Sequence, residues 1–238
     1  MAAQTLTIDG RHISAEAGAS VLQAATEAGI EIPTLCHLEG IDDIGACRLC
    51  LVEVKGSAKL HPACTTVVRE GMEISTDSER LRNYRRIVIE LLFAERNHVC
   101  STCVSNGYCE LQDLAIAHGI DHVRYPYRFP RWGVDASHRL FGMDHNRCVL
   151  CTRCVRACWY VEAAGTLNVA GRGGKAWIIT DLNDAWGDSE TCTSCGKCVS
   201  ACPTGALFNK GATAAEMRHD RSRLEYIVNA REKKEWSA

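Results

Sequence analysis

The number and spacing of the cysteines constrain this chain more than any other feature. Fifteen cysteines occur among 238 residues, and they fall into four groups along the sequence. An odd number of thiols cannot pair completely in disulfides, and disulfide frameworks are typical of short secreted chains. In a reducing compartment, clustered thiols are more often metal ligands. The spacing within each group therefore indicates what kind of metal site the chain can form.

The overall composition is that of an ordinary globular protein. Hydrophobic residues make up 46% of the chain and charged residues 24%, and the length allows one large domain or two to three small ones. The net charge of −2 gives no reason to expect nucleic acid or an acidic membrane as a partner. No apolar run reaches the roughly 18 residues of a transmembrane helix, and the first residues lack a secretory pattern. The expected location is the cytoplasm.

In the first group, a long segment separates the first cysteine from one C-x2-C pair, and the fourth cysteine lies far along the chain. Four thiolates are what one [2Fe–2S] cluster needs. Gly45 and Ala46 are small enough for backbone N–H groups to approach the sulfurs, and such hydrogen bonds raise the reduction potential. A four-cysteine zinc site is the alternative, but zinc modules usually contain two short C-x2-C pairs. The pattern favours a [2Fe–2S] cluster held by Cys36, Cys47, Cys50 and Cys64.

Two later groups repeat the spacing C-x2-C-x2-C-x3-C, the pattern of double-cluster ferredoxins. There, three closely spaced cysteines bind one [4Fe–4S] cubane and the fourth binds the other. Pro203 ends any helix after the second group, whereas Trp159 stands where a proline is common after the first. A zinc interpretation would have to explain eight cysteines in two matched sets. We predict one cubane held by Cys148, Cys151, Cys154 and Cys202, and another held by Cys158, Cys192, Cys195 and Cys198.

The remaining group contains three cysteines, Cys100, Cys103 and Cys109, preceded by His98. Three thiolates leave one corner of a cubane without a ligand, and every other cysteine is already assigned. Imidazole is a competent iron ligand that would raise the potential relative to thiolate. We therefore predict His98 as the fourth ligand. The alternative is that His98 is a packed or surface histidine and that another group completes the cluster.

The pattern around the first group predicts a small α+β sheet domain. Apolar alternation predicts short strands, with Asp9-Gly10 as a tight turn between the first two. Ser20 is a suitable N-cap for a helix that stops at Gly29. The predicted elements are strands at 4–8, 11–14, 51–54 and 72–74 and a helix at 20–28.

Helical periodicity follows this domain, at 78–96 and 110–118, and the tail from 213 to 236 is predicted to be a charged amphipathic helix. Residues 125–132 contain two prolines and four aromatics, which predicts an extended loop packed on the surface. The cluster Gly171–Gly174 lacks the spacing G-x-G-x-x-G and predicts a hairpin turn. The chain is therefore expected to bind neither FMN nor NAD by itself.

The order of the cysteine groups resembles a known family. It is similar to the amino-terminal part of the large iron–sulfur subunit of respiratory complex I, and of iron-only hydrogenases, over about residues 4–210. Residues 95–113 and 144–154 are closer still to the small iron–sulfur diaphorase subunit of the bidirectional NAD-reducing [NiFe] hydrogenase. The sequence lacks the molybdopterin-enzyme-like half of the complex I subunit and the hydrogen-activating domain of iron-only hydrogenases, which favours the diaphorase subunit. One residue separates His98 from Cys100, where complex I has three.

The resemblance implies an α+β fold with three cluster-binding parts and a tail. The first is a plant-ferredoxin-like β-grasp domain, the second a small helical His/Cys3 domain, and the third a bacterial-type double [4Fe–4S] ferredoxin domain. The expected ranges are 1–77, 78–133 and 134–210, with a helical tail at 211–238.

The resemblance also implies a function, namely electron transfer through one [2Fe–2S] and three [4Fe–4S] clusters in an NAD-reducing hydrogenase. The implied partners are an FMN- and NAD(H)-binding diaphorase subunit, the small and large [NiFe] hydrogenase subunits and, as a further candidate, a small [2Fe–2S] subunit. The chain itself is expected to have no catalytic residue. Two alternatives stay open. One is an electron-transfer subunit of another NAD-linked dehydrogenase, such as formate dehydrogenase or a complex I-like enzyme. The other is a zinc-binding interaction module.

Overall fold

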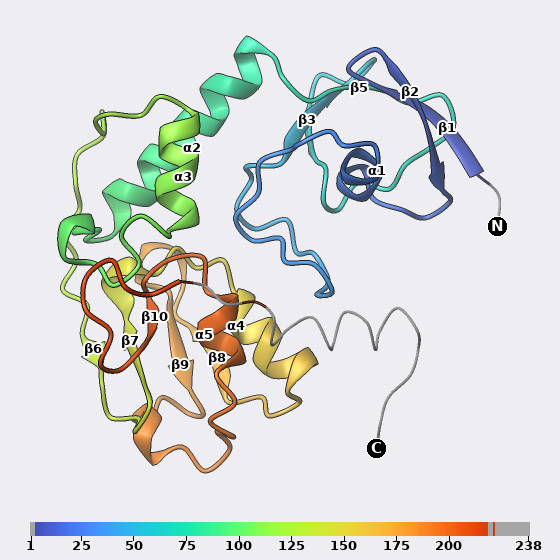
Figure 1. The fold of residues 1–238 in the computed structure, drawn as a ribbon. Helices are drawn as coiled ribbons and strands as arrows, with labels where there is room; N and C mark the ends of the chain where they lie inside the picture. The colour runs from blue at the N-terminus through green and yellow to red at the C-terminus, as the bar shows by residue number, and fades with distance from the viewer. Residues whose placement is uncertain (1–2, 219–220, 222–238) are drawn as a thin grey trace. The chain divides into compact units, whose positions relative to one another are not determined.

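The computed structural model describes residues 3–218 and Arg221, which fall into two compact units. The first unit contains residues 3–37 and 43–89, and the second contains residues 38–42 and those from 90 onward. Figure 1 shows the elements of each unit along the chain. Among the described residues, no helix is long and apolar enough to cross a membrane.

A five-stranded mixed sheet forms the framework of the first unit. Its order is β2-β1-β5-β3-β4, with β1 parallel to β5 and the other neighbours antiparallel. The alternation along β1 places Leu6 and Ile8 in the core, where they are almost fully buried. The strands are β1 (Ala3–Ile8), β2 (Arg11–Glu16), β3 (Leu51–Val54), β4 (Leu60–Pro62) and β5 (Glu73–Ser75).

Helix α1 (Val21–Glu27) packs against this sheet (Figure 1). Ser20 begins the helix, because its hydroxyl accepts a hydrogen bond from the Gln23 N–H at 3.1 Å. Gly29, at φ +68°, ends it. The predicted helix and four predicted strands are confirmed here, and so is the α+β, ferredoxin-like class of this part of the chain. Strand β4 was not predicted, because it is only three residues long and carries a proline at a sheet edge.

Helix α2 (Glu79–Glu95) follows the sheet, as predicted. Its buried Arg85 is 5% exposed and donates three hydrogen bonds to backbone carbonyls of the first unit. The acceptors are Leu49 O at 3.2 Å, Leu51 O at 3.1 Å and Thr76 O at 2.8 Å. Arg85 therefore joins the start of β3, next to Cys50, to the end of β5.

The second unit contains two small sheets and several short helices. One sheet has the order β10-β7-β6 and the other pairs β8 with β9, all antiparallel. Trp186, at 1% exposed, is among the largest fully buried side chains in the described part of the chain. The elements are α3 (Glu110–Ala117), β6 (Val134–Asp135), β7 (Phe141–Asp144), α4 (Arg153–Arg156), β8 (Leu167–Ala170), β9 (Trp177–Thr180), α5 (Lys197–Ala201) and β10 (Leu207–Asn209).

Two loop predictions for this unit are confirmed. Gly171, at φ +75°, begins the turn between β8 and β9, and a Cβ added there would collide with the carbonyl of Lys175. Residues 125–132 form neither a helix nor a strand, as expected for a segment rich in proline. This segment packs on the end of α2, where Arg128 N donates to Ala94 O at 2.9 Å and Asn97 Nδ2 donates to Pro130 O at 2.7 Å.

The predicted tail helix is wrong over its described part. Residues 213–218 contain a turn at 214–215 but no helix. Ala215 N donates to Cys103 O at 3.0 Å, and Met217 N donates to Val104 O at 2.9 Å. These contacts hold the segment beside a cysteine group, which the helical periodicity of the sequence could not reveal. Most of the predicted helix, from 219 to 236 apart from Arg221, lies outside the described residues.

Arg85→Leu is expected to destabilise the first unit by about 2–4 kcal/mol, because three carbonyls lose a charged, buried donor. The measurement is the free energy of unfolding of the full chain, from urea titrations followed by circular dichroism. The control is Arg82→Leu, which removes only an exposed ion pair with Asp77 and should cost about 0–1 kcal/mol. Equal costs for the two variants would contradict the role given to Arg85.

Candidate metal centres

The four cysteines of the first group lie together in the first unit. Cys47 N donates to Cys36 Sγ at 3.5 Å, and the Cys36 and Cys47 side chains hydrogen-bond with each other. Cys50 and Cys64 form a second hydrogen-bonded pair, and Cys50 also interacts electrostatically with Cys36. Gly45 has a φ of +62° beside this loop, a conformation that favours glycine. The structure thus brings together all four residues that the sequence singled out.

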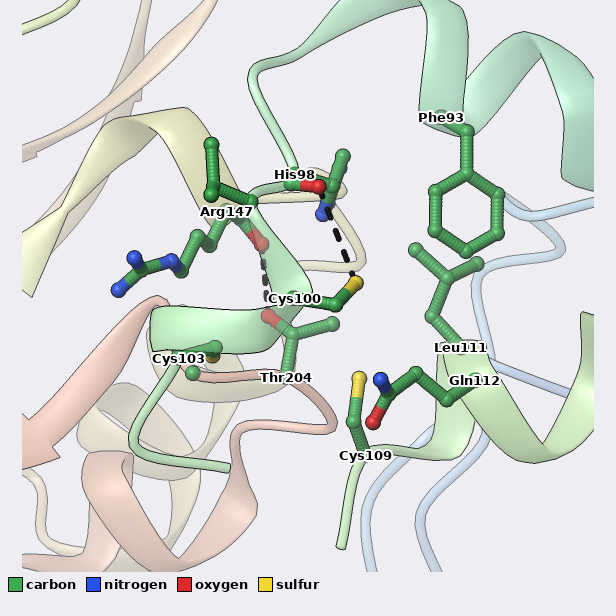
Figure 2. Close-up of a pocket in the computed structure, with 11 residues that line it drawn as sticks. Phe93, His98, Cys100, Cys103, Cys109, Leu111, Gln112, Arg147 and Thr204 are labelled. Atoms are coloured by element: carbon green, nitrogen blue, oxygen red, sulfur yellow. Dashed lines mark hydrogen bonds between the residues drawn. The ribbon is translucent and has the colours of Figure 1, made fainter. Parts of the chain in front are cut away.

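The residues of the second group line one pocket, whose walls include His98, Cys100, Cys103 and Cys109. Figure 2 shows the sulfur atoms of Cys100 and Cys109 facing the same open space, with Leu111 beside it. Gly205 also lines the pocket, and a Cβ added there would collide with Cys103 Sγ. The glycine therefore leaves room for the Cys103 sulfur.

The His98 ring has the state expected of a metal ligand. Its Nε2 is buried and lacks a hydrogen-bond partner among the described residues, whereas the ring donates to the backbone of Leu92. The donor is therefore Nδ1, and the lone pair of Nε2 stays free. Burial, together with the charges of Arg147 and Arg96, lowers the pKa of His98 to about 4. The imidazole is thus neutral at pH 7, with an available nitrogen.

The last two groups line two further pockets. The sets are crossed in the way that the double-ferredoxin spacing predicts. Cys202 lies with the three closely spaced cysteines of the earlier group, and Cys158 lies with those of the later group. One pocket contains Cys148, Cys151, Cys154 and Cys202, and the other contains Cys158, Cys192, Cys195 and Cys198.

The backbone repeats between these two groups. Leu150 and Ser194, each directly before the second cysteine of its group, have φ values of +51° and +58°. Thr152 and Gly196, each directly after that cysteine, have φ values of +57° and +74° and begin α4 and α5. Left-handed backbone is costly for residues other than glycine, so its repetition at matched positions indicates a shared loop shape that turns three cysteines toward one point.

The raised pKa values of several thiols show that these groups need nearby positive charge to become thiolate ligands. Burial raises the pKa of Cys148 to about 11 and that of Cys151 to about 12. It also raises the pKa of Cys109 to about 12. Several thiolates cannot share one buried pocket unless positive charge compensates them, and bound iron supplies that charge. The donor set therefore fits a charged metal cluster.

Several residues of these sites were not found from the sequence. Gln112 hydrogen-bonds Cys100, and Thr204 and Arg147 line the same pocket. Trp186 donates its indole N–H to Cys192 at 3.3 Å. Thr204 and Gly205 could have been found from the sequence, because they are small residues directly after Cys202-Pro203. No pattern pointed to Trp186, because it reaches Cys192 only through the tertiary fold.

Family models cover most of the chain. They carry the descriptions of a 2Fe-2S iron–sulfur cluster binding domain, the NADH-ubiquinone oxidoreductase-G iron–sulfur binding region, the ferredoxin-like domain of NADH-quinone oxidoreductase subunit 3 and a 4Fe-4S dicluster domain. They match residues 2–79, 85–124, 139–208 and 184–235, respectively.

Similar proteins include both longer chains and chains of matching length. The alpha subunit of NADPH-Fe(3+) oxidoreductase of Geobacter sulfurreducens is 36% identical over 206 residues, which is 87% of this chain but only 24% of that protein. The mitochondrial 78 kDa subunit of NADH-ubiquinone oxidoreductase of Candida albicans is 36% identical over 207 residues, or 86% of this chain and 28% of that protein. The chain thus spans about a quarter of these longer relatives. The gamma subunit of NAD-reducing hydrogenase HoxS of Cupriavidus necator is 34% identical over 211 residues, with 86% of each chain covered.

A solved structure gives the same result. A chain in the crystal structure of NAD+-reducing [NiFe]-hydrogenase in the H2-reduced state matches with a TM-score of 0.83 and 36% identity. The match covers 89% of both chains. These matches confirm the family resemblance drawn from the sequence. The chain belongs to the family of iron–sulfur subunits represented by the gamma subunit of NAD-reducing hydrogenase HoxS.

Proposed function

We propose that this chain is the iron–sulfur electron-transfer subunit of an NAD-reducing [NiFe] hydrogenase. The observation that carries the proposal is the grouping of fifteen cysteines and His98 into four sets, three of which line separate pockets. Similarity to the HoxS gamma subunit over 86% of each chain supports the hydrogenase assignment. The proposed reaction of the whole complex is the reduction of NAD+ by H2.

The proposed cofactors are one [2Fe–2S] and three [4Fe–4S] clusters. Cluster type follows the ligand number and spacing of each set. The [2Fe–2S] ligands are Cys36, Cys47, Cys50 and Cys64. The ligands of the first cubane are His98, Cys100, Cys103 and Cys109. The second cubane is held by Cys148, Cys151, Cys154 and Cys202, and the third by Cys158, Cys192, Cys195 and Cys198.

His98 is a histidine among cysteine ligands, and the hydrogen bonding of its imidazole supports its role as a ligand. The Nδ1–H bond to Leu92 holds the ring and leaves Nε2 free toward the pocket. Ligating histidines commonly donate their second N–H to a backbone carbonyl, which orients the ring. Three thiolates from Cys100, Cys103 and Cys109 leave one cubane corner for this nitrogen.

The chain's own residues bind the clusters, exclude water and set potentials. When bound, the clusters would act as one-electron carriers between partner subunits whose reactions each transfer two electrons. Buried thiolates hold them, and hydrogen bonds such as that from Cys47 N to Cys36 Sγ stabilise negative charge on sulfur. No other catalytic role is proposed for a residue of this chain.

The proposed partners are an FMN- and NAD(H)-binding diaphorase subunit and the small and large [NiFe] hydrogenase subunits, with a small [2Fe–2S] subunit as a further candidate. A cytoplasmic location stays a prediction. The second candidate function is electron transfer in another NAD-linked dehydrogenase. It is favoured by the match of 86% of the chain to the 78 kDa subunit of NADH-ubiquinone oxidoreductase at 36% identity.

Metal analysis tests the cluster count. The anaerobically purified chain should contain about 14 irons with a matching amount of acid-labile sulfide, and little zinc. Cys50→Ala should lower the iron content by about 2, and Cys103→Ala by about 4, because each removes a ligand of one cluster. A colourless protein that binds zinc and contains no sulfide would support the zinc-binding module instead.

Replacing His98 tests its role as a ligand. His98→Cys should keep the cubane but lower its potential, on the order of 100 mV, because thiolate donates more charge than imidazole. His98→Ala should shift or remove one [4Fe–4S] signal in electron paramagnetic resonance. His122→Ala is the matched control, since its side chain is 69% exposed. Unchanged signals and iron content in both His98 variants would exclude His98 as a ligand.

Co-purification tests the hydrogenase assignment. The tagged chain, isolated from its native cells, should carry a flavin subunit and a nickel-containing subunit, with nickel near one atom per chain. The untagged cells provide the background. A complex that retains flavin and iron but contains no nickel would favour the second candidate, a different NAD-linked dehydrogenase.

A further inference from the structure

The indole N–H of Trp186 points at the sulfur of Cys192, one of the cysteines proposed to hold the third cubane. Trp186 Nε1 lies 3.3 Å from Cys192 Sγ. Both residues line the same pocket, and the tryptophan is only 1% exposed. Water therefore does not compete for this N–H, and the sulfur is its partner.

The backbone around Trp186 is fixed against strand β6 and the residues after it. Trp186 N donates to Asp135 Oδ2 at 2.8 Å, and Gly187 N donates to Ser137 Oγ at 2.7 Å. A Cβ added to Gly187 would collide with the backbone of Ser137. This close approach holds the indole in one position relative to the pocket.

An aromatic stack fixes the ring itself. His138 lies 5.0 Å from Trp186 and 4.9 Å from Phe141, measured between ring centroids. His138 Nδ1 accepts hydrogen bonds from the N–H groups of Leu140 and Phe141, so its own proton is on Nε2. That nitrogen lies 3.1 Å from Ser194 Oγ and 3.9 Å from Cys192 Sγ. The stack therefore places a second ring N–H 3.9 Å from the same sulfur.

We propose that Trp186 is a positioning residue whose N–H raises the reduction potential of the third cubane through Cys192. The inference rests on the proposed ligand set Cys158, Cys192, Cys195 and Cys198. An N–H donor stabilises negative charge on sulfur, and the reduced form of a cluster places more negative charge on its ligands. The hydrogen bond is therefore stronger in the reduced form, and its removal lowers the potential.

The substitution Trp186→Phe keeps an aromatic ring in the stack and removes the N–H. In the anaerobically purified full chain, the substitution should lower the equilibrium constant for reduction of one [4Fe–4S] cluster about tenfold. For a one-electron couple, this change lowers the midpoint potential by about 59 mV. The readout is a redox titration followed by electron paramagnetic resonance, with iron content measured in parallel.

The matched control is Trp159→Phe. Trp159 directly follows Cys158, but its indole N–H donates to Leu167 O at 3.1 Å rather than to sulfur. The same substitution beside the same ligand set should leave all midpoint potentials unchanged. Equal shifts in the two variants, or no shift in Trp186→Phe with its iron intact, would overturn the proposal.

A second measurement decides the matter if Trp186→Phe loses iron. A chain in which Trp132, Trp159, Trp177 and Trp236 are each replaced by Phe, made with indole-15N-tryptophan, carries the label at Trp186 alone and should show 15N hyperfine coupling to a reduced [4Fe–4S] cluster. Absence of that coupling would overturn the role of Trp186. Failure of the cluster assignment is a separate result, since the unsubstituted chain would then lack iron, sulfide and the [4Fe–4S] signals altogether.

Discussion

Buried sulfur must be paired with positive charge, and the architecture of this chain is arranged around that requirement. Cys36 and Cys50 are each 1% exposed, and Cys151 and Cys154 are 7% exposed. Burial raises the pKa of Cys148 to about 11 and the pKa of Cys151 to about 12, so their pocket favours thiolate only when metal charge compensates it. Cluster binding and a stable interior are therefore coupled, as in other proteins whose metal sites form with the fold.

The second unit shows how little regular structure such sites require. Helices α4 and α5 have only four and five residues, and their sheets have two and three strands. Two loops with the same left-handed positions and two crossing cysteines, Cys158 and Cys202, provide most of the organisation. Since each crossing cysteine lines the pocket of the other group, neither pocket is complete without both halves of the repeat.

Sequence patterns predicted helices, strands and turns well where residues close in the chain determine them. The α1 helix has its cap at Ser20, and the β8–β9 hairpin turns at Gly171 because a side chain would not fit there. The prediction missed β4, because this strand is too short to show a pattern of its own and forms by pairing with β3. It was wrong for residues 213–218, where hydrogen bonds to Cys103 and Val104 hold a turn despite a helical pattern. In both cases hydrogen bonds to another segment decided the structure.

The kind of chemistry follows from the amino-acid order, because cluster ligation depends on the number, type and spacing of the donor residues. The sequence therefore indicated four cysteine sets, the crossed pairing and the place of His98. The surroundings of those donors, in contrast, depend on the folded chain. The free Nε2 of His98, the three-carbonyl contact of Arg85 and the N–H of Trp186 at Cys192 join residues that are distant or unpatterned in the chain. Hydrogen bonds and burial act through space, so their effect on potential and stability appears only once the chain is folded.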